Sequence, residues 1–145
     1  MKTLQRATPC VGICSTTYGD LVCRGCKRFA HEIVQWNAYT EAQRSTVWRR
    51  LFELRAEAVQ SALEVSDPRA FQAAVQAFEL PEDEPWAVLA YELLRRVVSR
   101  DQPLETYGLS AQGDADVLPV LRRIDAEIFE RARAHYEHSY RVSAQ

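Results

Sequence analysis

The apolar residues of this chain recur every three or four positions over most of its length, which is the spacing of helices that bury one face. The longest such run covers residues 41–65, and Thr40 with Gln43 forms a capping box at its start. The pattern therefore predicts one long helix in this part of the chain. Its apolar stripe consists of Val47, Leu51, Leu54, Ala58 and Leu63.

Other segments carry shorter helical patterns. A short helix is predicted to begin at or just after Cys26, the last cysteine, and to end near residue 36. Asp67 and Pro68 are a strong start signal for a third helix, because aspartate caps free N–H groups and proline is tolerated in the first turn. The third, fourth and fifth helices are predicted over residues 68–80, 86–100 and 117–140.

No segment alternates between apolar and polar residues over the length of a strand, so the predicted fold class is all-α. We expect an irregular four-cysteine metal loop, then a helical hairpin, then a C-terminal bundle of about three helices. The predicted division assigns residues 1–65 to a metal-binding module that includes the hairpin. Residues 66–145 then form a helical extension.

All the cysteines of the chain lie within residues 10–26, with the spacing Cys10-x3-Cys14-x8-Cys23-x2-Cys26. Two cysteines separated by two or three residues can turn both sulfurs towards one centre, and two such pairs can close a tetrahedral site. We therefore predict that these four residues are the ligands of one metal centre.

Neighbouring residues are assigned to the same site. Gly12 and Gly25, one inside each cysteine pair, are predicted to let backbone N–H groups turn towards the sulfurs. Arg28 is predicted to balance part of the negative charge of the centre. Cys26 stands at the predicted start of a helix, where free N–H groups and the helix dipole lower the pKa of a thiol.

The spacing leaves the nature of the centre open, because zinc, a single iron and iron–sulfur clusters all accept four thiolates. Two disulfides are a further alternative. The N-terminal residues contain no apolar run of the kind found in signal peptides. We therefore expect a cytoplasmic protein, in a reducing compartment where clustered cysteines bind metal more often than they pair.

Several short motifs, "TPCVGIC", "CRGCKR", "EIVQW", "TEAQR" and "VWRRL", occur in this order over about residues 8–54. Together they resemble a small bacterial family of unknown function whose members are labelled predicted iron–sulfur proteins. The resemblance implies an iron–sulfur cluster, with zinc as the alternative. The chain departs from the family pattern at Val22 and Tyr39, where leucine and methionine are usual. The matching positions are Pro9, Cys10, Gly12, Cys14, Cys23, Gly25, Cys26, Arg28, Glu32, Ile33, Trp36 and Thr40.

Charge is distributed unevenly: residues 1–60 contain nine Lys/Arg and five Asp/Glu, whereas residues 61–145 contain nine and fifteen. A basic half is compatible with nucleic-acid binding, but metal-bound thiolates also account for the cations beside the cysteines. Another group of arginines alternates with glutamates on the long helix, so we interpret it as a salt-bridged solvent face. This group consists of Arg44, Arg49, Arg50 and Arg55.

Aromatic residues and histidines offer other candidate sites. Trp36, Trp48 and Phe52 could form a stacking platform, but their helical spacing favours a small core packed against the metal loop. His135 and His138 stand three positions apart near the C-terminus, and we assign them to an exposed helix face.

No phosphate-binding glycine loop, dinucleotide fingerprint or catalytic triad is present, so we favour a non-enzymatic role and predict no small-molecule substrate. No apolar run approaches the roughly 20 residues of a membrane span. The predicted function is a metal-binding accessory protein with an iron–sulfur cluster, acting in electron transfer, redox sensing or cluster handling with an unidentified protein partner. The alternatives are a structural zinc module that presents a protein–protein interaction surface, and nucleic-acid binding through the basic half.

Overall fold

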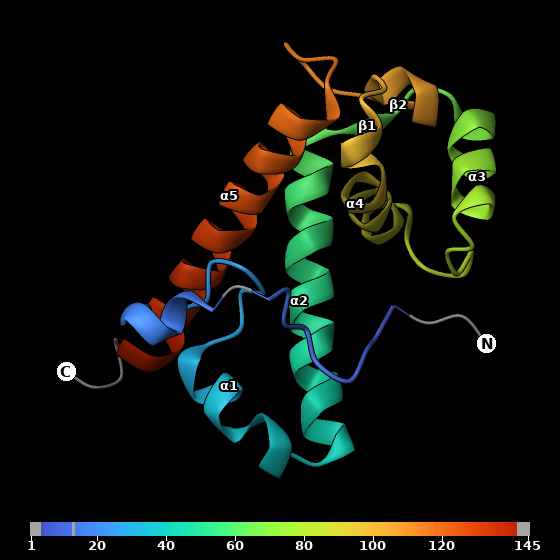
Figure 1. Ribbon diagram of the computed structural model, residues 1–145. Helices are drawn as coiled ribbons and strands as arrows, with labels where there is room; N and C mark the ends of the chain where they lie inside the picture. The colour runs from blue at the N-terminus through green and yellow to red at the C-terminus, as the bar shows by residue number, and fades with distance from the viewer. Residues whose placement is uncertain (1–3, 13, 142–145) are drawn as a thin grey trace. The chain divides into compact units, whose positions relative to one another are not determined.

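The computed structural model describes residues 4–12 and 14–141, with the backbone alone at residue 141. The described residues are mostly helical and confirm the predicted all-α class (Figure 1). A cysteine-rich segment with one 3₁₀ turn, Ser15–Tyr18, precedes the α-helices. The α-helices are α1 (Ala30–Gln35), α2 (Glu41–Ala62), α3 (Pro68–Ala77), α4 (Trp86–Val97) and α5 (Val117–Tyr136), and the strands are β1 (Glu64–Val65) and β2 (Leu109–Ser110).

The predicted caps of α2 and α3 are confirmed. The Gln43 N–H donates to the Thr40 hydroxyl over 3.2 Å, and the Thr40 N–H donates to Gln43 Oε1 over 2.8 Å. At α3, Asp67 Oδ1 accepts from the N–H groups of Arg69 and Ala70. Both caps satisfy backbone donors that the first helical turn leaves free, which explains why the two helices begin where the sequence predicts.

The predicted start of α1, at or just after Cys26, is wrong, because the helix begins at Ala30. Residues 21–30 form a hairpin-like turn first. The Cys23 N–H donates to the Arg28 carbonyl, and the Ala30 N–H donates to the Leu21 carbonyl. These backbone groups form hydrogen bonds across the turn, so they cannot also form the hydrogen bonds of a helix. The helix therefore begins only after the turn.

The short pair of strands was not predicted. β1 and β2 pair antiparallel, with Glu64 opposite Ser110 and Val65 opposite Leu109. Two residues are too short a run for alternation of apolar and polar positions to be recognised. The pair joins the end of α2 to the loop that precedes α5, which gives this long loop a fixed point.

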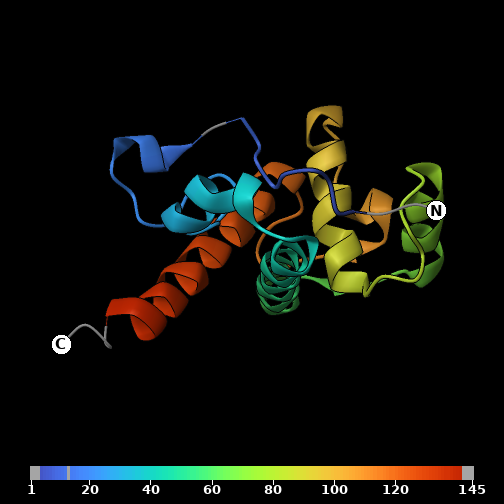
Figure 2. The same ribbon diagram turned by 90° about the horizontal axis from the view of Figure 1, so that it is seen from below.

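Contacts divide the chain into two compact units. The cysteine unit contains residues 5–54 and 127–141, and the helical unit contains residue 4 and residues 55–126. In the cysteine unit, the segment that leads into α1 lies against the second half of α5 (Figure 2), where the Arg24 guanidinium stands 4.5 Å from the centre of the Phe129 ring. The predicted division at residues 65 and 66 stays a prediction.

Each unit has apolar side chains that are almost completely buried. In the cysteine unit, Trp36, Val47, Trp48 and Leu51 form one core, with Phe52 packed against it. This confirms the interpretation of the aromatic residues as a core. The predicted stripe of α2 is buried throughout its length. Buried residues of the helical unit include Val59, Leu80, Leu93, Leu94, Val97, Leu104, Leu109 and Ile124.

None of the helices in the described part of the chain is long and apolar enough to cross a membrane.

Gly108 is required by the backbone of the helical unit. Its φ is 72°, and a Cβ built there would stand 2.3 Å from the Asp67 carbonyl oxygen and 2.6 Å from the Phe71 nitrogen. Gly113 has a similar φ of 78° but open space around it. We predict that Gly113→Ala costs about 1 kcal/mol of unfolding free energy through left-handed strain. Gly108→Ala should cost at least about 2 kcal/mol more, because backbone must also move.

Urea denaturation of both variants measures the difference. Equal losses of unfolding free energy in the two variants would show that the close approach to Asp67 and Phe71 is not a constraint.

Candidate metal centre

The second cysteine pair is held by a turn in which both ends are fixed by backbone hydrogen bonds. The Cys23 N–H donates to the Arg28 carbonyl, and the Lys27 N–H donates to the Cys23 carbonyl, each over 2.9 Å. Lys27 adopts a left-handed conformation with a φ of 66°, which closes the turn. Cys23 and Cys26 are both buried, and their side chains are joined by a hydrogen bond. The turn therefore brings two sulfurs together.

The Cys23 sulfur is surrounded by backbone donors. Burial acts to raise the pKa of this thiol, but the N–H groups of Cys26, Ser15 and Gly25 and the Cys26 side chain bring it below its ordinary value. Donors of this kind stabilise the thiolate, which is the form that binds metal. The predicted role of Gly25 at a metal centre stays a prediction.

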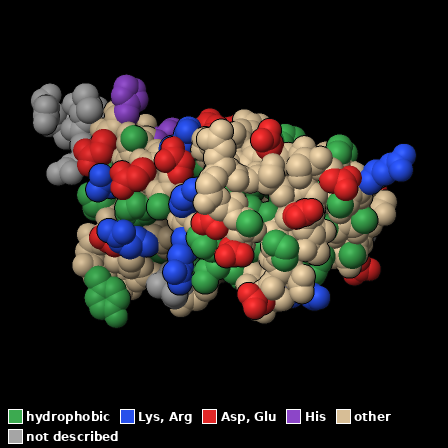
Figure 3. All heavy atoms as spheres, turned by 90° about the horizontal axis from the view of Figure 1, so that it is seen from above, with side chains coloured by type: hydrophobic (Ala, Val, Ile, Leu, Met, Phe, Trp, Pro, Cys, Tyr) green, Lys and Arg blue, Asp and Glu red, His purple; other side chains and the backbone are tan. Residues whose placement is uncertain are grey.

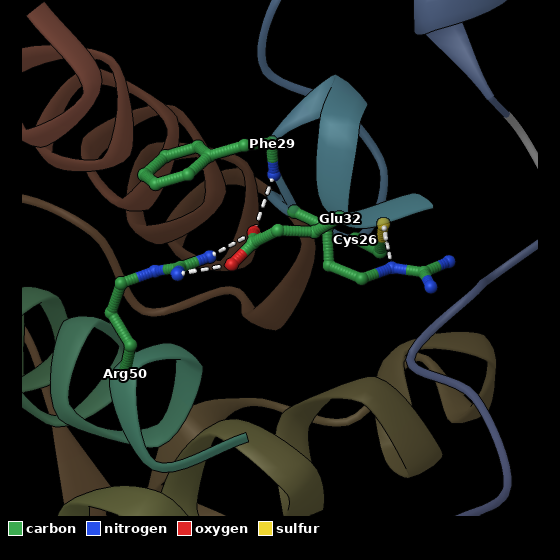
Figure 4. A network of polar contacts seen from close by, with 5 residues as sticks. Cys26, Phe29, Glu32 and Arg50 are labelled. Carbon is green, nitrogen blue, oxygen red and sulfur yellow. Dashed lines mark hydrogen bonds and ion pairs between the residues drawn. The ribbon is translucent and has the colours of Figure 1, made fainter. Parts of the chain in front are cut away.

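Cys26 receives a charged donor. The Arg28 Nε donates to the Cys26 sulfur over 3.3 Å, and both side chains are buried (Figure 4). Burial nevertheless raises the pKa of the Cys26 thiol, although Arg28 acts in the opposite direction. The expectation that a helix start lowers this pKa is wrong, because α1 begins only at Ala30. A cation beside the sulfur has the stabilising role that the helix dipole was expected to have.

The first cysteine pair is more accessible. The Cys14 sulfur lies 2.8 Å from the Thr16 hydroxyl, and this contact lowers the pKa of the Cys14 thiol. The charge of Cys23 acts on Cys14 as well and raises the pKa of the Cys14 thiol, but less than the Thr16 contact lowers it. Cys10 is exposed, and the Gly12 N–H donates to its sulfur over 3.4 Å. Gly12 has a φ of 93°, which a residue with a side chain rarely adopts.

The structure thus places Cys23 within electrostatic reach of both Cys14 and Cys26. It does not close a coordination site: among the residues described, no group of three or more His, Cys, Asp or Glu side chains is placed to hold a metal ion. The chemistry of the donors fits a metal that prefers sulfur, since each of the four thiols has an N–H or O–H group of the protein beside it. The assignment of four ligands stays a prediction.

A buried ion pair lies beside this turn. The Glu32 carboxylate accepts two hydrogen bonds from the Arg50 guanidinium, each over 2.6 Å, and a third from the Phe29 N–H over 2.8 Å (Figure 4). The Arg50 guanidinium also stands 4.1 Å from the centre of the Phe29 ring. This ion pair joins α1 to α2 beside the turn that carries Cys23 and Cys26.

The cysteine segment lies within a match to a known protein family. Residues 8–55 match the family model described as a protein of unknown function (DUF1289). The match covers about a third of the chain and confirms the resemblance predicted over residues 8–54. No curated protein and no solved structure is significantly similar to the chain.

Within the DUF1289 region, the interpretation of the arginines as a solvent face is wrong for Arg50 and for Arg55, which is only 7% exposed. The Arg50 side chain is 17% exposed and pairs with Glu32, rather than with a glutamate on its own helix. Regular Arg/Glu spacing indicates pairs along a helix, so it could not reveal a partner 18 positions away. The signal that was missed is Glu32, a carboxylate in a short helix with Ala30 and Ile33, which needs a cation when it is buried.

The end of α5 contributes to this region although it lies outside the DUF1289 match. The Phe29 ring contacts the rings of His135, Tyr136 and Tyr140, with centroid distances of 5.9, 5.2 and 5.6 Å. His135 and His138 are exposed, as predicted. Contacts over so long a sequence separation leave no local pattern, so they could not be predicted from the sequence.

We predict that Arg50→Leu lowers the unfolding free energy by about 3 kcal/mol, because it leaves the Glu32 carboxylate buried without its cation. Arg133 pairs with Glu130 on the exposed surface of the same unit, with both side chains more than half exposed. Arg133→Leu is therefore the matched control, and it should change the unfolding free energy by less than about 1 kcal/mol. Urea denaturation measures both values; similar losses in the two variants would contradict a structural role of the buried pair.

Proposed function

We propose that residues 8–55 form a metal module in which Cys10, Cys14, Cys23 and Cys26 bind an iron–sulfur cluster. The observation that carries this proposal is the set of donors at the second cysteine pair. The Arg28 Nε donates to the buried Cys26 sulfur, and the backbone N–H groups of Cys26, Ser15 and Gly25 lower the pKa of the neighbouring Cys23 thiol. A buried pair of thiols needs such donors if it is to exist as thiolates.

The choice of iron–sulfur over zinc rests on two considerations. The resemblance of residues 8–54 is to proteins labelled as iron–sulfur proteins. Hydrogen bonds to sulfur and the burial of the ligands are also the means by which a protein sets the reduction potential of such a cluster. The same donor set suits zinc, so a structural zinc module that supports a protein-interaction surface is the alternative outcome of the experiment below.

A cluster held by four cysteines supplies one-electron chemistry when it is bound. The chain's own residues hold the thiolates, exclude water from Cys23 and Cys26, and place the Arg28 cation against the sulfur. These tasks suit a protein that carries an electron, senses oxidation or handles clusters. With four protein ligands, no position is left open for a substrate to coordinate.

A protein partner in the cytoplasm completes the proposal. Val11, Tyr18 and Leu21 are exposed apolar residues in the cysteine segment, where a partner would approach the centre. The structure gives less support to nucleic acid as the partner. Arg28, Arg50 and Arg55 are largely buried, and on the face shown in Figure 3 basic and acidic side chains are interspersed.

The test is anaerobic purification from iron-replete cells, followed by the visible spectrum and by analysis of iron, zinc and acid-labile sulfide. We expect a coloured protein that contains iron and sulfide in comparable amounts. Cys23→Ser should lose both the colour and the iron, because it removes one of the four proposed thiolate ligands. Ala38→Ser, an exposed change in the same region, should retain them.

A colourless protein with stoichiometric zinc and no sulfide would replace the iron–sulfur cluster by the zinc alternative. A protein that holds neither metal, or a Cys23→Ser variant that keeps its metal, would overturn the proposal.

A further inference from the structure

Trp36 contacts three separate segments of the cysteine unit. Its indole Nε1 donates to the Ala7 carbonyl over 2.8 Å, so the side chain is held to the segment that leads into Cys10. Trp36 is 6% exposed, and Pro9, between Ala7 and Cys10, is buried too. The hydrogen bond therefore fixes the backbone just before the first cysteine, in a segment where Cys10 itself is exposed.

The face of the same ring supports the second cysteine pair. The Arg28 guanidinium stands 4.9 Å from the centre of the Trp36 ring, at the distance of a cation–π contact. The Nε of this guanidinium donates to the Cys26 sulfur. Stacking on a flat ring restricts the plane of a guanidinium, so Trp36 orients the donor that Cys26 receives.

The backbone of Trp36 is anchored in turn. Its carbonyl accepts a hydrogen bond from the Arg44 Nε over 3.0 Å, and a second Arg44 nitrogen donates to the Asn37 carbonyl over 3.2 Å. Arg44 belongs to α2, so the turn that carries Trp36 is tied to the longest helix of the chain. The indole is thus a rigid point to which both cysteine segments are attached.

We propose that Trp36 and Arg28 are positioning residues that hold the two cysteine pairs in place for one metal centre. This inference rests on the proposed function and deepens it. Four ligands on two segments bind more tightly when the segments are held in register before the metal arrives. The indole N–H sets the first segment, and the ring sets the second through Arg28. This assigns a task to two residues of the family pattern that are not themselves ligands.

The N–H of Trp36 can be removed while most of the ring volume is kept. Trp36→Phe removes the bond to Ala7, and Trp48→Phe is the matched control. Trp48 lies in the same core, is 2% exposed, and stacks on Phe52 at a centroid distance of 5.4 Å. The two variants should lose comparable packing, so a difference between them reports the indole contact to Ala7.

The first readout does not involve metal. Trypsin cleaves after Arg6, directly before Ala7, and Arg6 is exposed. We expect Trp36→Phe to be cleaved at this bond several times faster than the wild-type protein, whereas Trp48→Phe is cleaved at close to the wild-type rate. Equal cleavage of the two variants would overturn the positioning role, whether or not the protein holds a metal.

The second readout is the rate at which purified, loaded protein loses its metal to an excess of chelator. Loss of a hydrogen-bonded support beyond the ligands typically weakens a metal site 10–100-fold. We expect Trp36→Phe and Arg28→Met to release metal about 10–100 times faster than the wild-type protein. Arg28→Lys should recover part of the loss by restoring a cation, and Trp48→Phe should behave like the wild-type protein.

The two readouts separate the possible failures. If the wild-type protein holds no metal, the proposed function fails and the trypsin experiment alone decides the positioning role. If the wild-type protein holds metal, but Trp36→Phe and Trp48→Phe release it at the same rate, the proposed function stands and the positioning role is overturned.

Discussion

The cysteine unit depends on the buried ion pair between Glu32 and Arg50. Removing both charges from water costs several kcal/mol, and the two short hydrogen bonds with a third from the Phe29 N–H offset that cost. Because Glu32 lies on α1 and Arg50 on α2, this geometry can form only when the two helices meet in one register. The turn that carries Cys23 and Cys26 ends at Phe29, so the same pair also fixes where those sulfurs lie. Arg28 and Trp36, on either side of Glu32 in the sequence, are placed by the same contact.

The candidate centre is thus a short cysteine segment held by helices that contribute no ligand. Its polar groups are matched to negative sulfur: backbone N–H groups at Cys23, a guanidinium at Cys26 and a hydroxyl at Cys14. A pair of disulfides would leave such donors without negative charge to stabilise. The accessible part of the segment is the first cysteine pair, with the exposed apolar residues Val11, Tyr18 and Leu21 near it in the sequence.

Whether a feature of the structure could be predicted depends on how far apart in the sequence the interacting residues lie. The caps at Thr40 and Asp67 are local, and the stripe of α2 repeats over many turns, so both could be recognised from the sequence. The start of α1 could not, because hydrogen bonds across the turn at Cys23 compete with the helix. The partner of Arg50 and the rings that cover Phe29 come from other segments, and no local spacing encodes them. For the site, the sequence predicts which residues carry sulfur; the hydrogen-bond donors beside these sulfurs became evident only in the structure.

The most direct test of the central claim is X-ray absorption at the metal edge of the anaerobically purified protein. The account predicts that sulfur alone is bound to the metal, at about 2.3 Å as thiolate ligands give, with further iron atoms beyond it. Oxygen or nitrogen atoms making up most of the ligands would contradict the claim that the cysteines hold the centre.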